Sequence, residues 1–222
     1  VGSRFERDYK ELEHFGSYEL ITPECKFTDD TVFTIAVMQT FTSGRLKAKN
    51  FTDNLVKWGR KYPEAGYGRA TQAWIASENP QPYGSNRNGA AMRVAPCASF
   101  ARSLDKALEY ARISAEVSHN TPEGVTGAQA VVAAIFMAMT GATKEDIRDY
   151  VQGRFGYDLD MTMQRLRNSW SGFSCKAADT VPQALVCFLE SHNVESAIRN
   201  AISLCSDADT IAAMAAAIAA PY

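Results

Sequence analysis

The stretch Thr28-Asp29-Asp30-Thr31 leads directly into residues 32–38, an apolar segment in which only Thr34 is polar. The chain repeats this arrangement far downstream, where Asp207-Ala208-Asp209-Thr210 leads into residues 211–220, which contain no polar side chain. A helix that is apolar on every face is a buried helix. The sequence therefore predicts two buried helices, each of which begins at a pair of aspartates.

Four carboxylates at the ends of two buried helices pose a problem of charge. One aspartate at such an end is an ordinary cap, and a cap followed by a solvated turn explains either cluster taken alone. Four carboxylates in one low-dielectric site need compensating positive charge, and few Lys or Arg lie close to them in sequence. Oxygen-only ligands favour magnesium, manganese or calcium over zinc. Together, the two clusters therefore predict a shared cation site.

The composition describes one compact domain, residues 1–222, with a sizeable core. The chain has 222 residues, a net charge of -2 and 46% hydrophobic residues. This near-neutral charge gives no electrostatic signature of a nucleic-acid or membrane partner, and no apolar run approaches the ~18 to 20 residues of a membrane span. The five cysteines are odd in number and form no CxxC pair, which indicates a reduced, cytoplasmic setting.

Helix-capping signals recur along the chain, whereas the alternation typical of strands is almost absent. They predict helices from Ser103 to about Val117, from Thr121-Pro122 through Met139, from a Thr143/Asp146 capping box to Gly153, from Pro182 to about Ser191, where Asn193 closes the helix, and then onward to Leu204. Residues 61–102, rich in Gly, Pro, Asn and Tyr, are typical of a long functional loop with short helical pieces. The predicted fold class is all-α, with two buried central helices.

Further motifs accompany the two aspartate clusters in a fixed order. They are Gly2-Ser3-Arg4-Phe5-Glu6, Phe27-Thr28-Asp29-Asp30-Thr31, Tyr62-Pro63 with Gly66-Tyr67-Gly68, Asn88-Gly89-Ala90-Ala91-Met92-Arg93-Val94, Ser118-His119-Asn120, Pro122-Glu123-Gly124, Gly127-Ala128, Thr180-Val181-Pro182 and Asp207-Ala208-Asp209-Thr210. In order, spacing and identity they resemble the ADP-ribosylglycohydrolase family, which includes the dinitrogenase reductase-activating glycohydrolases and the J1 crystallins. The resemblance covers nearly the whole chain. It implies an orthogonal, single-domain helical bundle around a dinuclear metal site, usually with two magnesium or manganese ions.

Transferred position by position, the resemblance implies a set of metal ligands and a set of catalytic residues. The metal ligands would be Thr28, Asp29 and Asp30 from one side, and Asp207, Asp209 and Thr210 from the other. The catalytic candidates are Glu6, Asp30 and Asp207, and one carboxylate among these or Asp29 would take a proton from water. Glu6 matches an early glutamate at the family's metal centre. By sequence alone, Glu6 beside Arg4 and Arg7 is an ordinary solvent-exposed acid.

Five more residues are predicted to bind the substrate: Asn88, Gly89, Met92, His119 and Tyr83. Gly89 permits close approach of the backbone to a ligand, although a tight turn before a helix explains the same run. In the family a histidine at the position of His119 contacts the ligand, whereas a lone histidine is more often a structural hydrogen-bonding residue. Tyr83 and Tyr67 could stack on adenine or ribose, or they could simply anchor the loop.

The resemblance implies hydrolysis of the glycosidic bond between ADP-ribose and a modified protein side chain, with arginine as the leading acceptor. The expected partners are an ADP-ribosylated protein as substrate and ADP-ribose as product, with no membrane, and the near-neutral charge disfavours a nucleic acid. An acceptor on a nucleobase or a small molecule is a further alternative.

A catalytically impaired descendant, either an ADP-ribose-binding protein or a crystallin-like structural protein, is also an open alternative. Several departures from the family pattern favour it. Cys205-Ser206 stands where relatives have two glycines, Arg69 and Arg87 stand where glycine is frequent, and short N- and C-terminal family segments are expected to be missing.

Overall fold

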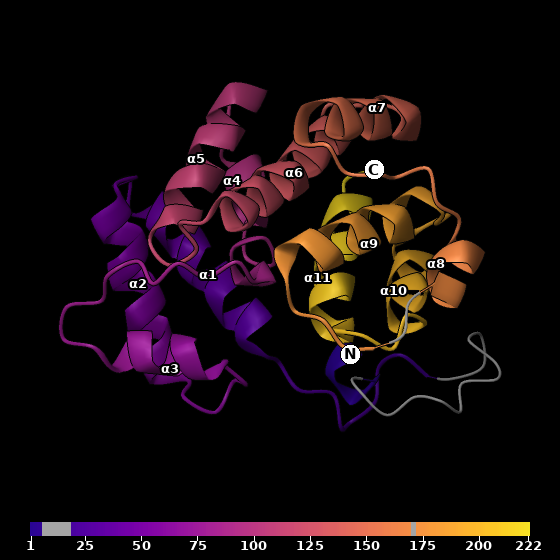
Figure 1. Cartoon of the computed structure of the whole chain (residues 1–222). Helices are drawn as coiled ribbons and strands as arrows, with labels where there is room; N and C mark the ends of the chain where they lie inside the picture. The colour runs from indigo at the N-terminus through magenta and orange to yellow at the C-terminus, as the bar shows by residue number, and fades with distance from the viewer. Residues whose placement is uncertain (6–18, 170–171) are drawn as a thin grey trace.

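The computed structural model describes residues 1–5, 19–169 and 172–222, and helices are the only extended regular elements within those ranges (Figure 1). The elements are η1 (Gly2–Phe5), α1 (Asp29–Thr42), α2 (Ala48–Lys61), α3 (Arg69–Ala76), η2 (Asn88–Ala90), α4 (Ala95–Ser99), α5 (Leu104–Glu116), α6 (Pro122–Met139), α7 (Lys144–Phe155), α8 (Met163–Ser169), α9 (Ala177–Leu189), α10 (Val194–Ile202) and α11 (Ala208–Ala219). The all-α prediction is confirmed.

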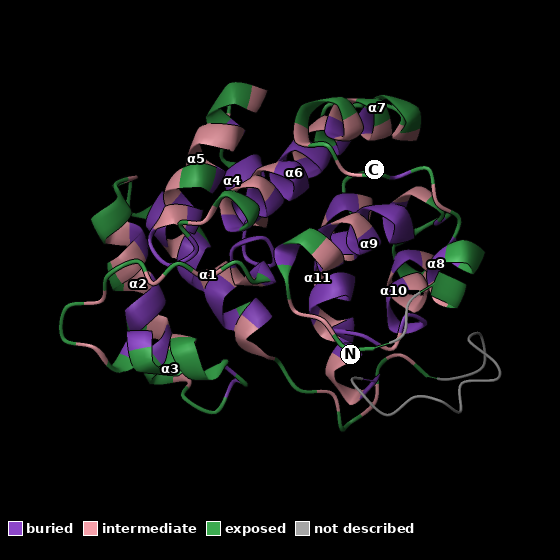
Figure 2. Ribbon diagram, in the orientation of Figure 1, coloured by how far each residue is buried: buried purple, intermediate pink, exposed green. Residues whose placement is uncertain are grey.

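Helix α6 is the centre of the bundle. It packs against α4 and α5 on one side and against α9 and α11 on the other, with α7 folding back along it. In Figure 1, α1 to α5 gather on one side of the molecule and α8 to α11 on the other, with α6 between them. Figure 2 shows that α6, α9 and α11 are buried along most of their length. The two halves share one apolar core, to which Phe33, Leu185 and Ile211 contribute.

The two helices that follow the aspartate clusters are largely buried, as predicted. In α11, Ile211, Met214 and Ile218 are each at most 1% exposed. In α1, Val32 and Phe33 are buried, but the outer face reaches the surface, where Met38 is 45% exposed. Helix α1 therefore has one solvent-facing side despite its apolar sequence, because α2, α4 and α11 cover only the rest of it.

Local capping chemistry sets several of the helix starts. The Ser103 side chain accepts a hydrogen bond from the Lys106 N–H at the start of α5. The Thr121 side chain caps α6 in the same way, and Pro122 occupies the first turn, where its missing N–H costs no helical bond. Thr143 and Asp146 form the reciprocal capping box predicted for α7. These three helices begin where the sequence predicts.

The predicted end of α7 at Gly153 is wrong. The helix continues to Phe155, and Gly156 ends it in the left-handed conformation, with φ of +74°. A glycine terminates a helix only where the backbone adopts that conformation, and Gly153 keeps a helical geometry instead. Which of the two glycines, Gly153 or Gly156, ends α7 depends on the direction in which the following segment leaves the helix.

The predicted start of α9 at Pro182 and the predicted role of Asn193 are also wrong. Helix α9 begins five residues earlier, at Ala177, and Pro182 lies inside it. A proline there removes one backbone hydrogen bond, and the burial of Val181 and Leu185 around it outweighs that loss. Asn193 does not close α9 but caps the start of α10, through a bond from the Ser196 N–H, and α10 ends at Ile202.

Helix α6 is long and apolar enough, by length and composition alone, to cross a membrane. However, 56% of it is buried inside the protein, and the core helix of a soluble protein passes the same test.

Residues 61–102 form the predicted irregular segment, interrupted by α3, η2 and α4. This segment leads from the end of α2 past the start of α1.

Candidate active site

The starts of α1 and α11 meet, and they bring the two aspartate clusters together. The two helices pack against each other. The negative charge of Asp209 raises the pKa of Asp30, and Asp207 and Asp209 both raise the pKa of Asp29. Residues almost 180 positions apart in sequence therefore form one acidic site.

The first cluster is organised mainly by its own residues. The Thr28 hydroxyl donates a 2.7 Å hydrogen bond to Asp30 Oδ2, and the Thr34 hydroxyl donates to the Asp30 carbonyl oxygen. The Asp29 N–H donates to the Ala65 carbonyl at 2.7 Å. Thr28 occupies the N-cap position, but its side chain caps no N–H group in the described structure. The hydroxyl instead binds the carboxylate, contrary to the simple capping interpretation.

The second cluster depends on side chains from distant segments. The Asn88 amide Nδ2 donates to Asp207 Oδ2 at 2.8 Å and to Thr180 Oγ1 at 3.2 Å. Asp207 occupies the N-cap position of α11 without capping an N–H of the described helix, whereas Asp209 Oδ1 accepts the Thr210 N–H at 2.8 Å. Asn88 thus links η2, α9 and the start of α11.

Burial and mutual repulsion raise the pKa values of three carboxyl groups in the site. Desolvation is the largest cause in each case, and it raises the pKa of Asp29 to about 8, of Asp30 to about 6 and of Asp207 to about 7. The hydrogen bonds from Thr28 to Asp30 and from Asn88 to Asp207 act in the opposite direction. A cation or bound protons must therefore balance the site near neutral pH.

The donor atoms fit a hard divalent cation in their chemistry. All of them are oxygens, and Asp30 Oδ1 is buried without a hydrogen-bond partner among the described residues. Within residues 1–5, 19–169 and 172–222, however, no three His, Cys, Asp or Glu side chains are arranged to hold one ion. Threonine hydroxyls and water would have to complete the coordination. Glu6, predicted as a catalytic residue, lies outside the described residues.

The N-terminal residues pack directly against the second cluster. A Cβ atom on Gly2 would lie 2.4 Å from Asp209 Cα and 2.6 Å from the Ala208 carbonyl oxygen. Phe5 packs against Ala208 and Ile202 in a small separate apolar cluster. Only glycine at position 2 therefore permits this close approach to the turn that carries Asp209.

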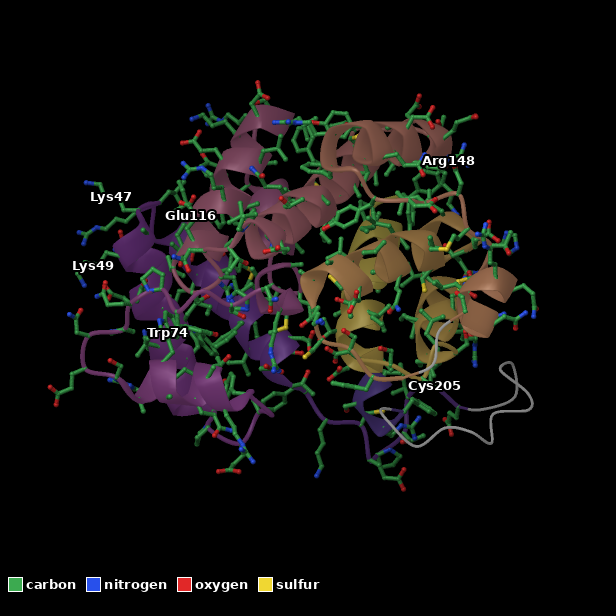
Figure 3. All side chains as sticks on the ribbon, viewed as in Figure 1. Lys47, Lys49, Trp74, Glu116, Arg148 and Cys205 are labelled. Carbon is green, nitrogen blue, oxygen red and sulfur yellow. The ribbon has the colours of Figure 1, made fainter. Side chains whose placement is uncertain are left out.

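The loop before the second cluster retains a glycine-like backbone although it lacks glycine. Cys205, which Figure 3 labels in the lower part of the view, has φ of +51°, the left-handed conformation that favours glycine. The neighbouring Ser206 is fully buried, and its Oγ accepts the Ser174 N–H at 3.2 Å. Where the sequence departs from the family pattern, the structure thus has local backbone strain at Cys205 and a side-chain hydrogen bond at Ser206.

A cavity of about 680 Å³ opens above the acidic site. Asp29, Asp207, Asp209 and Thr210 line it, together with four of the predicted substrate-binding residues that surround it: Gly89, Met92, His119 and Tyr83. Asn88 lines it as well, but its amide is engaged by Asp207, so its observed role is to orient that carboxylate. Thr28 and the buried Asp30 are not among the lining residues. The structure thus brings most of the predicted site residues to one cavity, and their roles stay predictions.

Two tyrosines that the sequence treats alike have different surroundings. Tyr83 lines the cavity, and its hydroxyl lies 3.0 Å from the Thr71 hydroxyl. Tyr67 is only 4% exposed, and its ring packs on Phe33 with centroids 5.1 Å apart, so it belongs to the core. Burial raises the pKa of Tyr67 strongly.

Several cavity residues escape sequence-based assignment of a role. Arg69, Thr71, Arg87, Phe173 and Cys175 all line it. The two arginines are noticeable in sequence as substitutions at glycine-rich positions, but nothing in the sequence places them on the same cavity. Whether these residues line the cavity depends on the path of the chain around η2 and before α9.

A family model described as ADP-ribosylglycohydrolase matches residues 2–222, and this chain belongs to that family. It is 28% identical to the ADP-ribosylarginine hydrolase Tri1 of Pseudomonas putida (strain GB-1) over 99% of this chain and 66% of the relative. It is 25% identical to the ADP-ribosylhydrolase ARH3 of Mus musculus over 88% of this chain and 69% of the relative. This chain thus spans about two thirds of the length of these curated relatives.

A solved structure described as an ADP-ribosylglycohydrolase-related protein complex has the same fold. It superposes with a TM-score of 0.70 and 25% sequence identity, and covers 89% of this chain and 71% of that chain. The family match and the names of the relatives support a glycohydrolase enzyme. Neither the metal nor the acceptor follows from these comparisons.

Proposed function

We propose that this protein, as one domain over residues 1–222, hydrolyses the glycosidic bond between ADP-ribose and a modified protein side chain. The observation that carries the proposal is the convergence of the two aspartate clusters at a cavity lined by Gly89, His119 and Tyr83. The relatives named for hydrolysis of ADP-ribosyl groups support the reaction class. The name of the bacterial relative supports arginine as the leading acceptor.

We also propose that the reaction depends on magnesium or manganese, with two ions at full occupancy. The residues that would hold them are Thr28, Asp29, Asp30, Asp207, Asp209 and Thr210. Bound there, the ions would supply Lewis acidity that lowers the pKa of a water molecule. The buried oxygen of Asp30 that lacks a partner, and the raised pKa values of the site, support this dependence.

The chain's own residues supply orientation and proton transfer. The side chain of Asp207 lines the cavity. Asn88 donates a hydrogen bond to Oδ2 of Asp207 and thereby also fixes the orientation of its Oδ1. We propose Asp207 as the leading base that takes the proton of the attacking water, with Asp30 and Glu6 as the other candidates. Gly89 leaves room for a ligand to approach the backbone closely.

The direct test is release of free ADP-ribose from an ADP-ribosylated protein in the presence of magnesium, of manganese, or of a chelator. Substrates with arginine-linked and serine-linked ADP-ribose would identify the acceptor. The variant Asp209→Ala should lose activity, whereas Asp53→Asn, an exposed aspartate on α2 paired with Lys49, should not. The enzyme proposal fails if no substrate releases ADP-ribose with either metal and Asp209→Ala behaves like the wild type.

The strained backbone at Cys205 is the observation that favours the alternative of a non-catalytic ADP-ribose-binding or structural protein. Strain beside Asp207 could lower the occupancy of a metal. Calorimetry with ADP-ribose, with and without manganese, distinguishes the three cases. An enzyme binds and turns over its substrate, a binding protein only binds ADP-ribose, and a structural protein does neither.

A further inference from the structure

His119 lines the cavity and lies in the turn between α5 and α6. It is 4% exposed. A Cβ atom on Gly89 would lie 2.9 Å from His119 Nε2, so the ring edge reaches the glycine directly. Nε2 makes no hydrogen bond within the described chain. It is also not one of the polar side-chain atoms that are both fully buried and without a partner there. This nitrogen is therefore open to a ligand.

The other ring nitrogen is held by a chain of buried groups. His119 Nδ1 lies 2.8 Å from Ser118 Oγ, and this oxygen accepts a 3.0 Å hydrogen bond from Arg93 Nη2. Arg93 is 1% exposed, and the same nitrogen also donates to the Ser114 carbonyl at 2.7 Å. The path from the core to the cavity is thus Arg93, Ser118, His119.

The direction of the hydrogen bonds along this path follows from which groups can donate. A guanidinium group only donates, so Ser118 Oγ must accept from Arg93. The Ser118 hydroxyl then has its own proton to place, in a residue that is 2% exposed. Among the described residues, His119 Nδ1 is the acceptor in contact with it. Nδ1 therefore accepts, and the single proton of a neutral imidazole lies on Nε2.

Burial, and then the positive charges nearby, keep the ring of His119 neutral. Burial is the largest cause that lowers the pKa of His119 well below its ordinary value, and the positive charges of Arg93 and Arg87 lower it further. The neighbouring titratable group, Tyr83, has its ring centroid 5.9 Å from that of His119. No carboxylate is among the groups that shift its pKa, so nothing there favours the imidazolium form.

We propose that Arg93 and Ser118 are positioning residues that fix His119 as the neutral tautomer protonated at Nε2. The ring thereby presents one N–H donor, beside Gly89, to an oxygen acceptor of the bound ligand. The identity of that ligand as ADP-ribose rests on the proposed function, but the tautomer is a property of the ligand-free protein. Fixing it in advance spares the ligand the cost of selecting one of two tautomers.

Nitrogen NMR of the imidazole rings in the full chain tests the tautomer directly. The chain has three histidines, so a His119→Asn variant assigns the signals of His119. Between about pH 6 and 8, the wild type should show Nδ1 without a proton and Nε2 with one. In Ser118→Ala both tautomers should appear, and the pKa of His119 should move upward toward its ordinary value. A proton on Nδ1 in the wild type overturns the proposal, as does an unchanged tautomer in Ser118→Ala.

Ser114→Ala is the matched control. The Ser114 hydroxyl is also buried but has no partner among the described residues, and Arg93 uses only its backbone carbonyl. Calorimetry should show ADP-ribose binding about 3- to 10-fold weaker in Ser118→Ala and unchanged in Ser114→Ala. Equal weakening in both variants would overturn the positioning role. If the wild type binds no ADP-ribose, the proposed function fails, and the NMR result still decides the tautomer.

Discussion

The two aspartate clusters look equivalent in sequence but are built differently. In the first, Thr28 donates to Asp30 within one helical turn, and Thr210 of the second cluster adds a hydrogen bond that lowers the pKa of Asp30. The second is assembled from elsewhere, with Asn88 bound to Asp207 and Gly2 packed on Asp209. Two similar sequence patterns thus form the two halves of one site in different ways. Local geometry supports the first cluster more, whereas the second cluster depends more on tertiary contacts. The second half should be the easier one to disturb from a distance.

The largest expected effect is on catalysis, and it should be shared by both clusters. Asp30→Asn and Asp207→Asn should each lower turnover by about 10²- to 10⁴-fold, the usual range for loss of acid–base catalysis. Neither should destabilise the metal-free protein, because each removes a carboxylate that its neighbours repel. Steady-state kinetics and urea unfolding measure the two effects. Full activity in either variant would exclude that carboxylate from the reaction.

The second-largest expected effect is on the free energy of unfolding, which should depend on pH and on added metal. Three carboxyl groups have pKa values of about 6 to 8 in the folded protein, above the ordinary value of 3.8. Between about pH 4 and 8 the folded protein thus binds more protons than the unfolded chain, so its free energy of unfolding should fall as pH rises. Added manganese should recover stability most at pH 8. Urea unfolding at pH 5 and pH 8, once with a chelator and once with manganese, measures the pH dependence and the effect of the metal. A free energy of unfolding that rises with pH in the chelator would contradict this account.

A smaller effect tests the dependence of the second cluster on the N-terminal residues. In Gly2→Ala, the new methyl group would overlap the backbone of Asp209 and destabilise the protein by about 1–3 kcal/mol. The affinity for manganese should fall with it. Gly153→Ala is the control, since a Cβ there meets no described atom within 4 Å and the helix should gain stability. Equal responses of the two variants would show that the contact at Gly2 is dispensable.

The smallest expected effect concerns the loop at Cys205. Cys205→Gly relieves a left-handed conformation that costs a non-glycine residue about 1–2 kcal/mol, and the greater flexibility of glycine in the unfolded chain offsets about half of this gain. Cys205→Ala keeps the Cβ atom and should bring no gain. Urea unfolding distinguishes the two. A higher midpoint in the glycine variant, with higher metal affinity, would show that strain weakens this half of the site.

Sequence-based prediction succeeded where local chemistry decides the outcome. Caps such as Ser103 and Thr121 predict helix starts, since their side chains satisfy N–H groups within the next three residues. It failed at Pro182 and Gly153, where packing and chain direction override local preference. It also did not predict α2 and α8. The amphipathic α2 begins at Ala48, and the side chain of its N-cap residue, Lys47, makes no capping bond in the described chain.

By itself, the sequence determined an all-α fold, two buried helices headed by aspartates, and the residue types of an oxygen-lined site. These follow from periodicity, burial and the cost of unbalanced charge, which are properties of residues close in sequence. Only the tertiary structure decided how the clusters are held, with Asn88 bound to Asp207, and that Arg93 and His119 both contact Ser118. Such contacts join residues whose proximity comes from the packing of the whole bundle around α6.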